Sequence, residues 1–502
     1  MKIRLFLLSI LSISLFLFAE QLFFPNDVRI GDPSINYVNP EISPVGNYMV
    51  WIEVDTATGV LGRVWHCGID PNTGDLIPPN GKGFSPFYSN IYARPGDWGI
   101  DSIGSYYVGA TFNGQIKFVR PTSPTSGIVT DIPLPAVNKR RVFYASQLPG
   151  INRRFVSYIY NDSVNGFSQN TPENSYFQLH LLDLDNPSND YLIEEQPSMY
   201  PLPIPMDIIV PRWIKGSHYL TYGYKDQSNR VQAKEFNAYT PQNQAIPVTN
   251  DPANKIDGNS ALNPFTNEQY FMSGINASDT AYFYKRNSFG SMFILDEIVV
   301  PQSVHLDTPS LNQSHEPFLF DGHLYSAFQI NNWDGNFFNT TFNEPGEIWM
   351  VTIDADTQRF WLLSEFDSTL NVSEPEPYVG NNEVWVYYSA NVIDTTKPFF
   401  KRQFQLRRCD TPLNNQPIKT ENGNDHKIKR IALYPNPTRG IIFFNDNDLV
   451  KTDFIVYNAL AQIVKRLHNQ HCIDISDMAD GVYFIEIQTE RQRLINKIVK
   501  KK

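Results

Sequence analysis

The sequence predicts an all-β fold, in which a β-propeller of seven blades is followed by a small β-sandwich. An apolar strand recurs with a mean period of about 56 residues, as expected of a repeat architecture. Aromatic residues make up 14% of the chain, 36 prolines and 28 glycines are spread along it, and long amphipathic helical patterns are absent. This composition favours short strands joined by turns. A chain of 502 residues also exceeds what one hydrophobic core usually supports, so at least two folded units are expected.

The N-terminus has the layout of a cleavable signal peptide over residues 1–19. Two basic residues, Lys2 and Arg4, precede an apolar run over residues 5–18, which ends at Ala19 and the polar Glu20. We predict cleavage between Ala19 and Glu20, with a retained anchor as the alternative. The run is too short to span a bilayer comfortably, and no other segment is apolar enough, so the mature chain is predicted to have no transmembrane segment.

Charge and cysteine content narrow the class of partner. The formal net charge is -11 and the isoelectric point is near 5.3, which argues against nucleic acid or an anionic bilayer as the main partner. Three cysteines, Cys67, Cys409 and Cys472, are too few for a disulfide scaffold, and their spacing does not suggest a zinc site. A Cys67–Cys409 bridge would join the first and last repeats, but the sequence alone does not show the required approach.

Seven repeat units are predicted within residues 20–410. Each has a turn rich in Pro, Gly or Asn and then an apolar strand; these strands open at Tyr48, Tyr106, Phe155, Tyr219, Tyr270, Leu324 and Val384. A second alternating strand follows most of them, and Asn72 and Gly74 supply the tight turn after one such strand. A sheet of about four strands cannot bury both faces alone, so we expect the sheets to pack radially around a channel.

The last unit lacks an obvious fourth strand. It offers strands near Tyr378, over residues 384–388 and over residues 400–406, with little after Cys409. We predict that residues 22–30, at the mature N-terminus, supply the missing strand, because such closure removes exposed sheet edges.

The repeats resemble the TolB-like, or WD40-like PD40, propeller family. The family pattern reads roughly Pro-x-Trp-Ser-Pro-Asp-Gly before an apolar strand. Pro211, Trp213 and Gly216 fit it in one repeat, and a second repeat matches at Pro40, Ser43, Pro44 and Gly46. The aspartate of the pattern is mostly missing here, and the third repeat is degenerate.

Residues 411–427 are polar and poor in apolar side chains, which predicts a linker before a C-terminal domain over residues 428–502. Short alternating strands and turn residues predict a small antiparallel, immunoglobulin-like sandwich there. The segment also carries several short motif residues: Tyr434, Pro435, Asn436, Pro437, Gly440, Gly481 and Tyr483. Tyr434 and Tyr483 are expected in the core.

These motifs resemble the type A C-terminal sorting domain of the type IX secretion system of Bacteroidetes. One departure is Ala461, where the family usually has Gly. The resemblance implies recognition by the type IX secretion machinery, removal of the domain, and attachment of the cargo to surface lipopolysaccharide or its release. The expected location is therefore the outer-membrane cell surface or the medium, reached through the periplasm.

Common enzyme signatures are absent from the sequence. There is no Gly-x-Ser-x-Gly elbow, phosphate-binding loop or HExxH motif. Polar residues in segments leading into the predicted inner strands are the catalytic candidates: Asp207, His305, Asp307, Glu374 and Glu376. Carboxylates beside a histidine can do acid–base chemistry on a sugar or hold a cation. The alternative is that these five residues are solvated groups that line the channel and have no catalytic or metal-binding role.

A cluster of histidines and a cluster of aromatic residues complete the candidates. His305, His315 and His323 invite comparison with metal-binding propeller lyases, but His323 opens a strand that should point away from the channel, and no metal or cofactor is predicted. Aromatic residues of the longest insert would form a stacking platform for a glycan or peptide, or would pack on themselves: Trp333, Phe337, Phe338 and Phe342. By contrast, Trp51, Trp213 and Trp385 occupy apolar repeat positions and are predicted to be core residues.

Three functions remain open on the sequence alone. The leading hypothesis is a non-enzymatic secreted propeller that binds a glycan, peptide or envelope component at its channel mouth. The alternative is a carbohydrate-active enzyme, a polysaccharide lyase or hydrolase, that uses the channel carboxylates. A third is a scaffold for other envelope proteins.

Overall fold

The computed structural model describes most of the repeat region and the core of the C-terminal unit. The described residues are 22–23, 27–55, 60–88, 97–111, 115–132, 140–145, 154–161, 176–197, 211–214, 216–228, 230–252, 255–274, 280–299, 306, 310–332, 343–354, 359–381, 383–397, 401–414, 433–434, 440–444, 453–458, 463–468, 472–488 and 493–501. The predicted signal peptide, its cleavage point at Ala19 and Glu20, and most of the predicted linker lie outside them.

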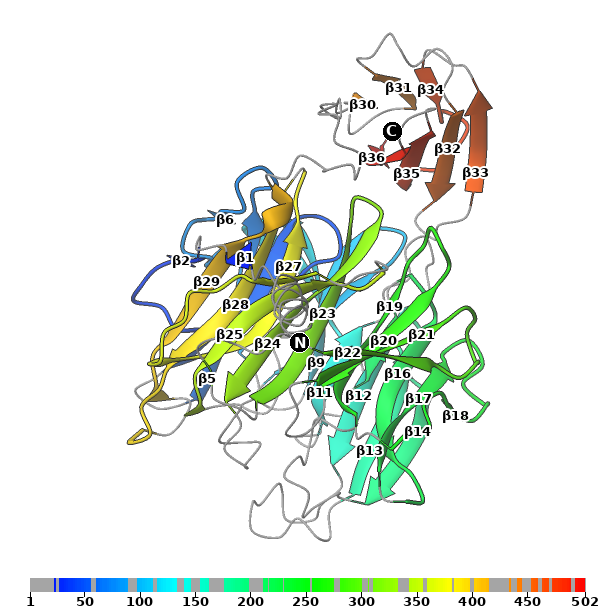
Figure 1. Cartoon of the computed structure of the whole chain (residues 1–502). Helices are drawn as coiled ribbons and strands as arrows, with labels where there is room; N and C mark the ends of the chain where they lie inside the picture. Colours follow the sequence, from blue (N-terminus) through cyan, green and yellow to red (C-terminus); the bar gives the residue numbers. More distant parts are fainter. Residues whose placement is uncertain are drawn as a thin grey trace, which may run out of the picture.

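The described part of the repeat region is all-β, with strands that follow one another as antiparallel hairpins (Figure 1). The first sheet contains β3 (Tyr37–Ile42), β4 (Tyr48–Asp55), β5 (Val60–Ile69) and β6 (Leu76–Ile77). The second contains β7 (Asp97–Ile100), β8 (Ser105–Ala110), β9 (Ile116–Ser123) and β10 (Ser126–Asp131). The third contains β11 (Arg140–Ala145), β12 (Phe155–Asn161), β13 (Tyr176–Asp183) and β14 (Asp190–Pro197).

Four more sheets follow in the same order. The fourth has β15 (Arg212–Trp213), β16 (Tyr219–Lys225), β17 (Val231–Asn237) and β18 (Ile246–Pro247). The fifth has β19 (Ile256–Leu262), β20 (Gln269–Gly274), β21 (Thr280–Arg286) and β22 (Ile294–Val299). The sixth has β23 (Ser310–Phe320), β24 (His323–Asn332), β25 (Gly346–Thr352) and β26 (Phe360–Leu362). The seventh has β27 (Leu370–Val379), β28 (Val384–Val392) and β29 (Phe404–Asp410).

The predicted repeat strands correspond to the second strand of each sheet. The strands β4, β8, β12, β16, β20, β24 and β28 begin at Tyr48, Ser105, Phe155, Tyr219, Gln269, His323 and Val384, within one residue of the predicted openings. The turn before them explains the Gly and Ser of the pattern. Gly46 and Gly216 both adopt positive φ, and the Ser43 hydroxyl accepts a hydrogen bond of 2.9 Å from the backbone N–H of Tyr48.

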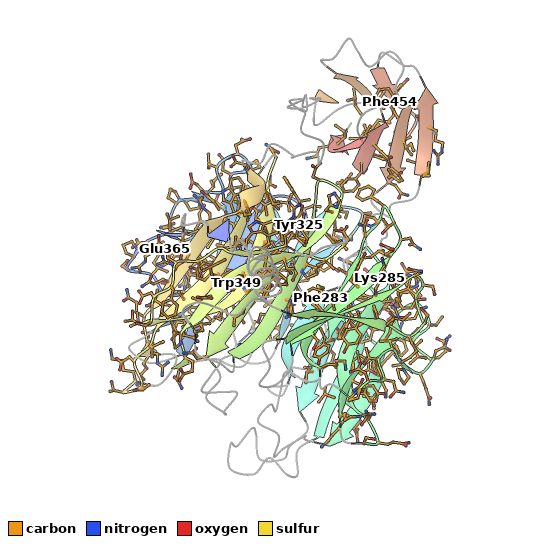
Figure 2. The ribbon with its side chains drawn as sticks, viewed as in Figure 1. Phe283, Lys285, Tyr325, Trp349, Glu365 and Phe454 are labelled. Carbon is orange, nitrogen blue, oxygen red and sulfur yellow. The ribbon has the colours of Figure 1, made fainter. Side chains whose placement is uncertain are left out.

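The sheets form a closed ring, because neighbouring sheets share apolar clusters all the way round. The first strands contact one another in sequence, from β3 through β7, β11, β15, β19, β23 and β27 back to β3. Seven clusters of buried side chains each join two successive sheets, and one of them joins the seventh sheet to the first. Figure 2 labels Phe283 and Trp349, two members of the cluster between the fifth and sixth sheets. The arrangement is that of propeller blades.

The three tryptophans predicted as core residues belong to these clusters. Trp51 is 0% exposed, Trp385 is 2% exposed and Trp213 is 5% exposed. Cys67 and Cys409 are also buried, and both are free thiols in separate clusters, so the bridge considered from the sequence is not formed.

The N-terminal segment closes the ring, as predicted. Strand β2 (Asp27–Ile30) pairs antiparallel with β29 and becomes the fourth strand of the seventh sheet. The shorter β1 (Leu22–Phe23) pairs parallel with β26 and adds a fifth strand to the sixth sheet. The segment therefore joins two sheets, where the prediction assigned it to one.

A buried ion pair fixes the closing strand. The Asp27 carboxylate accepts hydrogen bonds from Arg407 Nε at 3.0 Å, from the Tyr388 hydroxyl at 2.6 Å and from the backbone N–H of Glu365 at 3.2 Å. The Asp27 side chain is 1% exposed. Its partners belong to β28, β29 and the segment after β26, so one carboxylate joins β2 to both the sixth and the seventh sheet.

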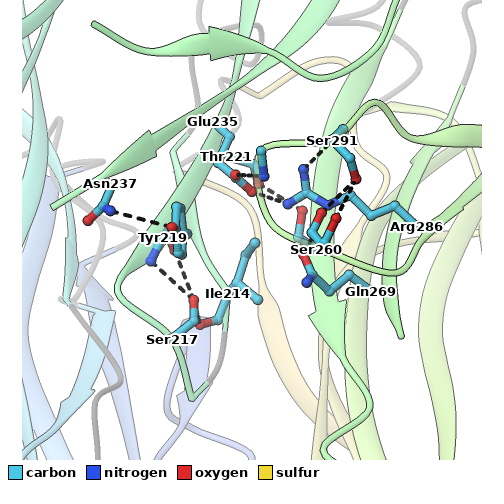
Figure 3. A network of polar contacts seen from close by, with 12 residues as sticks. Ile214, Ser217, Tyr219, Thr221, Glu235, Asn237, Ser260, Gln269, Arg286 and Ser291 are labelled. Carbon is cyan, nitrogen blue, oxygen red and sulfur yellow. Dashed lines mark hydrogen bonds and ion pairs between the residues drawn. The ribbon is translucent and has the colours of Figure 1, made fainter. Parts of the chain in front are cut away.

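A second buried ion pair joins the fourth and fifth sheets (Figure 3). Arg286 at the end of β21 pairs with Glu235 of β17, and both side chains are at most 1% exposed. Arg286 also donates to Gln269 Oε1 at 2.9 Å and to the carbonyl of Ser291 at 3.0 Å. The second Glu235 oxygen accepts from the N–H of Gly290 at 3.0 Å, so the pair is well satisfied for a buried charge.

The C-terminal unit is built from two small sheets with a core of their own. One sheet holds β30 (Leu433–Tyr434), β31 (Ile441–Phe444) and β34 (Cys472–Asp474). The other holds β33 (Ile463–His468), β32 (Asp453–Asn458), β35 (Gly481–Gln488) and β36 (Arg493–Lys500). Side chains of both sheets, including Phe454, share one buried cluster (Figure 2). This is the layout of a β-sandwich.

We predict that Asp27→Asn lowers the free energy of unfolding by about 3 kcal/mol, because it leaves Arg407 without its buried counter-charge. Limited proteolysis should then cut first within residues 22–30. The matched control is Asp75→Asn, because Asp75 pairs with Arg408, the neighbour of Arg407 on β29. The Asp75 side chain is 67% exposed, so this pair should contribute less than about 1 kcal/mol. Equal losses in the two variants, measured by urea unfolding of the full chain, would contradict this role for Asp27.

We also predict that acid destabilises the first two sheets through His66. Burial lowers the pKa of His66 to about 4, and its ring contacts the Tyr107 hydroxyl at 3.0 Å. The unfolded chain has an ordinary histidine pKa of about 6.5, so it binds more protons than the folded chain between these values, and stability falls as the pH is lowered. The loss from pH 7 to pH 5 should be about 2 kcal/mol and should be smaller in His66→Gln, as measured by urea unfolding at the two pH values. It should be larger in His323→Gln, because the pKa of His323 is raised in the folded chain and this residue therefore adds stability as the pH falls.

Candidate ligand-binding channel mouth

The inner strands of the sixth, seventh and first sheets, which are neighbours in the closed ring, each contain a β-bulge close to a glutamate. Asn39, Ser314 and Glu374 adopt positive φ values of 49°, 54° and 55° at register shifts in β3, β23 and β27. A glutamate lies two residues further along each strand, at Glu41, Glu316 and Glu376. Non-glycine residues rarely adopt this backbone conformation, and bulges of this kind often direct side chains at binding sites.

Glu316 is held by side chains from two other sheets. Arg212 Nη1 of the fourth sheet lies 3.3 Å from Glu316 Oε1. Asn259 Nδ2 of the fifth sheet donates to Glu316 Oε2 at 3.3 Å and to the carbonyl of His315 at 2.8 Å. The inner strands of the fourth, fifth and sixth sheets are therefore joined by one polar cluster.

A second polar cluster lies where the sixth and seventh sheets meet. The backbone N–H of Glu374 donates to Gln329 Oε1 at 2.8 Å, and Gln329 Nε2 donates to Asn331 Oδ1 at 3.0 Å. In the seventh sheet, Asn391 Nδ2 donates to Asn371 Oδ1 at 2.7 Å. All three of these amide side chains from β24 and β28 are almost completely buried, at 0–1% exposure.

The same cluster anchors the end of the longest insert. Asn371 Nδ2 donates to the carbonyl of Glu344 at 2.7 Å, which ties the segment after the insert to the inner strand of the seventh sheet. Residues 333–342 lie outside the described residues, so the structure does not test the predicted aromatic platform of Trp333, Phe337, Phe338 and Phe342.

This arrangement suits hydrogen bonding better than proton transfer. Neutral amides that hold one another cannot titrate, and because they are buried they fix the positions of the inner strands around them. Glu316 already accepts contacts from Arg212 and Asn259 on its two carboxylate oxygens. The described channel wall is thus preorganised for recognition.

Of the five catalytic candidates from the sequence, two lie on one described inner strand and three lie outside the described residues. Glu374 and Glu376 lie within the inner strand β27, because that strand begins at Leu370; the sequence analysis had placed them in the segment before it. Glu376 is 9% exposed. Asp207, His305 and Asp307 lie outside the described residues.

The described histidines of the predicted group do not converge. His315 lies within β23 and is 1% exposed, whereas His323 begins β24 and pairs with Asp354 at 3.6 Å. The nearby Asp354 carboxylate raises the pKa of His323 above its ordinary value. Among the residues that the structure describes, no three His, Cys, Asp or Glu side chains gather closely enough to hold a metal ion.

The sequence analysis missed the residues that hold these clusters together. Arg212 directly precedes Trp213, the tryptophan of the repeat pattern. This position, at the start of a predicted inner strand, was the one sequence feature that could have identified Arg212 as a channel residue. Gln329 and Asn331 alternate with apolar residues of β24, so they read as ordinary outward-facing strand residues until the packing of the sixth sheet is known.

The motif residues of the C-terminal unit occupy strand and turn positions. Tyr434 ends β30, and Gly481 begins β35. Tyr483 is 7% exposed, and its hydroxyl donates to the carbonyl of Ala479 at 2.7 Å. Gly440 has a φ of 140° beside Ser476, whereas Pro435, Asn436 and Pro437 lie outside the described residues.

Residues 432–501 match the protein family described as Secretion system C-terminal sorting domain. Such a domain is recognised by the secretion machinery, and it implies export to the cell surface or release from the cell. No curated protein matches the chain. In the described residues, no helix combines the length and apolar character needed to cross a membrane.

Several solved structures are similar to the chain at low identity. Oligogalacturonate lyase in complex with manganese is 12% identical, with 77% of this chain and 93% of that one covered and a TM-score of 0.40. Trypanosoma rangeli sialidase in complex with sialic acid is 8% identical, with 95% and 87% covered and a TM-score of 0.38. Prolyl oligopeptidase B from Galerina marginata is 11% identical with a TM-score of 0.36; the match covers 79% of this chain and spans about half, 49%, of the peptidase.

We predict that Gly440→Ala reduces export. A Cβ atom at Gly440 would lie 2.6 Å from Ser476 Cα, at a φ that L-residues rarely adopt, so the sandwich should lose roughly 1–3 kcal/mol. The matched control is Gly481→Ala, where the nearest atom to the added Cβ is 4.0 Å away. Surface and culture-medium fractions should contain several-fold less of the Gly440→Ala protein than of the control. Equal amounts would show that the position does not matter for sorting.

Proposed function

We propose that this protein is cargo of the type IX secretion system and binds a glycan, peptide or envelope component at the cell surface or in the medium. The observation that carries the proposal is the sorting domain at residues 432–501, which follows a closed ring of sheets. Ring closure leaves the loops at the channel mouth as the surface available for recognition, while the sorting domain accounts for export.

The finer assignments form part of the same proposal. The ring is a seven-bladed, TolB-like propeller within residues 20–410, and residues 428–502 form an immunoglobulin-like sandwich of the type A sorting class. Residues 1–19 are removed as a signal peptide, and residues 411–427 connect the two domains. After export, the sorting domain is cleaved and the propeller is attached to lipopolysaccharide or released.

The ligand is bound by the mouth side of the sixth and seventh sheets. Support comes from the buried amides Gln329, Asn331, Asn371 and Asn391, which hold this region rigidly, and from the insert that the Glu344 carbonyl anchors there. Rigid polar groups reduce the entropy lost on binding. The four aromatic residues of the insert would add stacking contacts.

We predict binding without turnover. The full chain, incubated with a panel of neutral and acidic polysaccharides, should be retained on at least one of them and should release no new reducing or unsaturated ends. Glu374→Gln and Glu376→Gln should each weaken retention at least threefold, because both residues belong to β27, the inner strand of the seventh sheet beside the proposed binding region. Glu365→Gln, an exposed glutamate between the sixth and seventh sheets (Figure 2), is the control.

Product formation that is lost in Glu376→Gln while binding persists would instead identify a carbohydrate-active enzyme. Retention of none of the polysaccharides, together with capture of an envelope protein, would favour the scaffold.

A further inference from the structure

A pocket opens at the mouth-side end of the first sheet, which neighbours the seventh sheet in the ring. Its volume is about 360 Å³, within the roughly 300–1,000 Å³ typical of small-ligand sites. The segment before β3, the end of β4 and the beginning of β5 form its walls. The lining residues that matter for recognition are Asn36, Glu53, Asp55, Gly62, Arg63 and Tyr88.

Close packing of β4 against β5 forms the floor of this pocket. The register between these strands shifts between Ile52 and Val54. At Gly62, an added Cβ atom would lie 2.4 Å from the backbone oxygen of Glu53, so only glycine allows this approach. Asn36 is held in place because its Oδ1 accepts from the N–H of Phe404 at 3.0 Å.

An exposed aromatic ring forms one wall of the pocket. Tyr88 is 55% exposed, which is unusual for a large aromatic side chain. Arg63 fixes its position: Nε donates to the Tyr88 hydroxyl at 2.8 Å, and the guanidinium carbon lies 4.9 Å from the ring centroid. The two residues also form a backbone bridge. A ring held this firmly offers a stacking surface with little conformational entropy to lose.

The charges around the pocket cancel. Glu53 pairs with Lys82 Nζ at 2.5 Å and accepts from Trp65 Nε1 at 2.9 Å. Asp55 and Arg63 contribute one further charge of each sign. An anionic ligand would therefore meet two carboxylates. A cationic ligand would meet Arg63 and a Glu53 carboxylate that Lys82 already neutralises, so the balance favours a neutral ligand.

The polarity of the lining favours a sugar over a peptide side chain. Val54 is the one aliphatic residue among the lining residues, and it is only 2% exposed. Carboxylate, amide and guanidinium groups beside an aromatic ring match the hydroxyl groups and the C–H face of a sugar ring. A peptide side chain would find little apolar surface to cover.

We propose that this first-sheet pocket binds one neutral sugar unit of a polysaccharide, stacked on Tyr88 and hydrogen-bonded to Asp55 and Arg63. The inference deepens the proposed function and rests on it, since it names the ligand class and adds a contact point on the mouth face. A polysaccharide chain that reaches both the first sheet and the sixth and seventh sheets would bind more tightly than either contact allows alone.

The test is calorimetric titration of the full chain with hexasaccharides. The neutral probes are hexamers of glucose, mannose and N-acetylglucosamine, and hexagalacturonate is the acidic probe. We expect at least one neutral hexamer to bind, with a dissociation constant that rises at least tenfold in Tyr88→Ala and threefold or less in Tyr88→Phe. Asp55→Asn should also weaken binding, and hexagalacturonate should bind more weakly than the best neutral hexamer.

The matched control is Tyr224→Ala. Tyr224 is a partly exposed tyrosine at the end of β16, and the ammonium of Lys234 lies 4.5 Å from its ring centroid, so its surroundings resemble those of Tyr88 on another sheet. Binding should be unchanged in this variant. Circular dichroism and the thermal midpoint of Tyr88→Ala must match the control, so that lost binding is not lost folding.

The outcomes separate this inference from the proposed function. Neutral hexamers that bind equally to the wild type and Tyr88→Ala, but more weakly to Glu376→Gln, would overturn the first-sheet pocket and leave the proposed function standing. Tighter binding of hexagalacturonate or of a peptide at Tyr88 would overturn the assignment to a neutral sugar. Binding of no hexamer would overturn the pocket, while the polysaccharide and envelope tests would still decide the proposed function.

Discussion

Burial of both faces of every sheet is the constraint on which the ring depends. A four-stranded sheet with apolar residues on both faces cannot be stable alone, and each cluster of buried side chains is shared by two neighbouring sheets. The cluster between the seventh and first sheets includes Trp385 and Trp51, so in the described part of the ring every sheet shares apolar side chains with both of its neighbours. The chain must then return to its beginning, and β2 does this by pairing with β29.

Ring closure also explains where the buried charges lie. Asp27 joins the closing strand to Arg407, and Glu235 joins the fourth sheet to Arg286 in the fifth. Buried ion pairs contribute little net stability compared with apolar replacements, but an unpaired partner is strongly destabilising. Such pairs penalise the wrong neighbour or the wrong register more than they stabilise the correct one. The contact between Arg212 of the fourth sheet and Glu316 of the sixth likewise pairs opposite charges from two different sheets.

The sorting domain keeps its core separate from the ring. Its buried cluster contains residues from Ile442 to Ile498 and none from the repeat region. This independence would allow the ring to stay folded if the sorting domain were removed after export, as proposed above.

The sequence by itself determined the all-β class, the repeat strands, the closing N-terminal segment and the sorting domain, because strand alternation and turn chemistry are local properties. Tyr48 and Val384, for example, mark strand openings through the residues beside them. The tertiary structure decided which polar side chains meet. Arg212 and Glu316, or Arg63 and Tyr88, are far apart in the chain, and Glu374 reads as a loop residue until the bulge in β27 is seen. Such contacts depend on how neighbouring sheets pack and on the register in which their strands pair. Neither property can be predicted from the residues next to each position in the sequence.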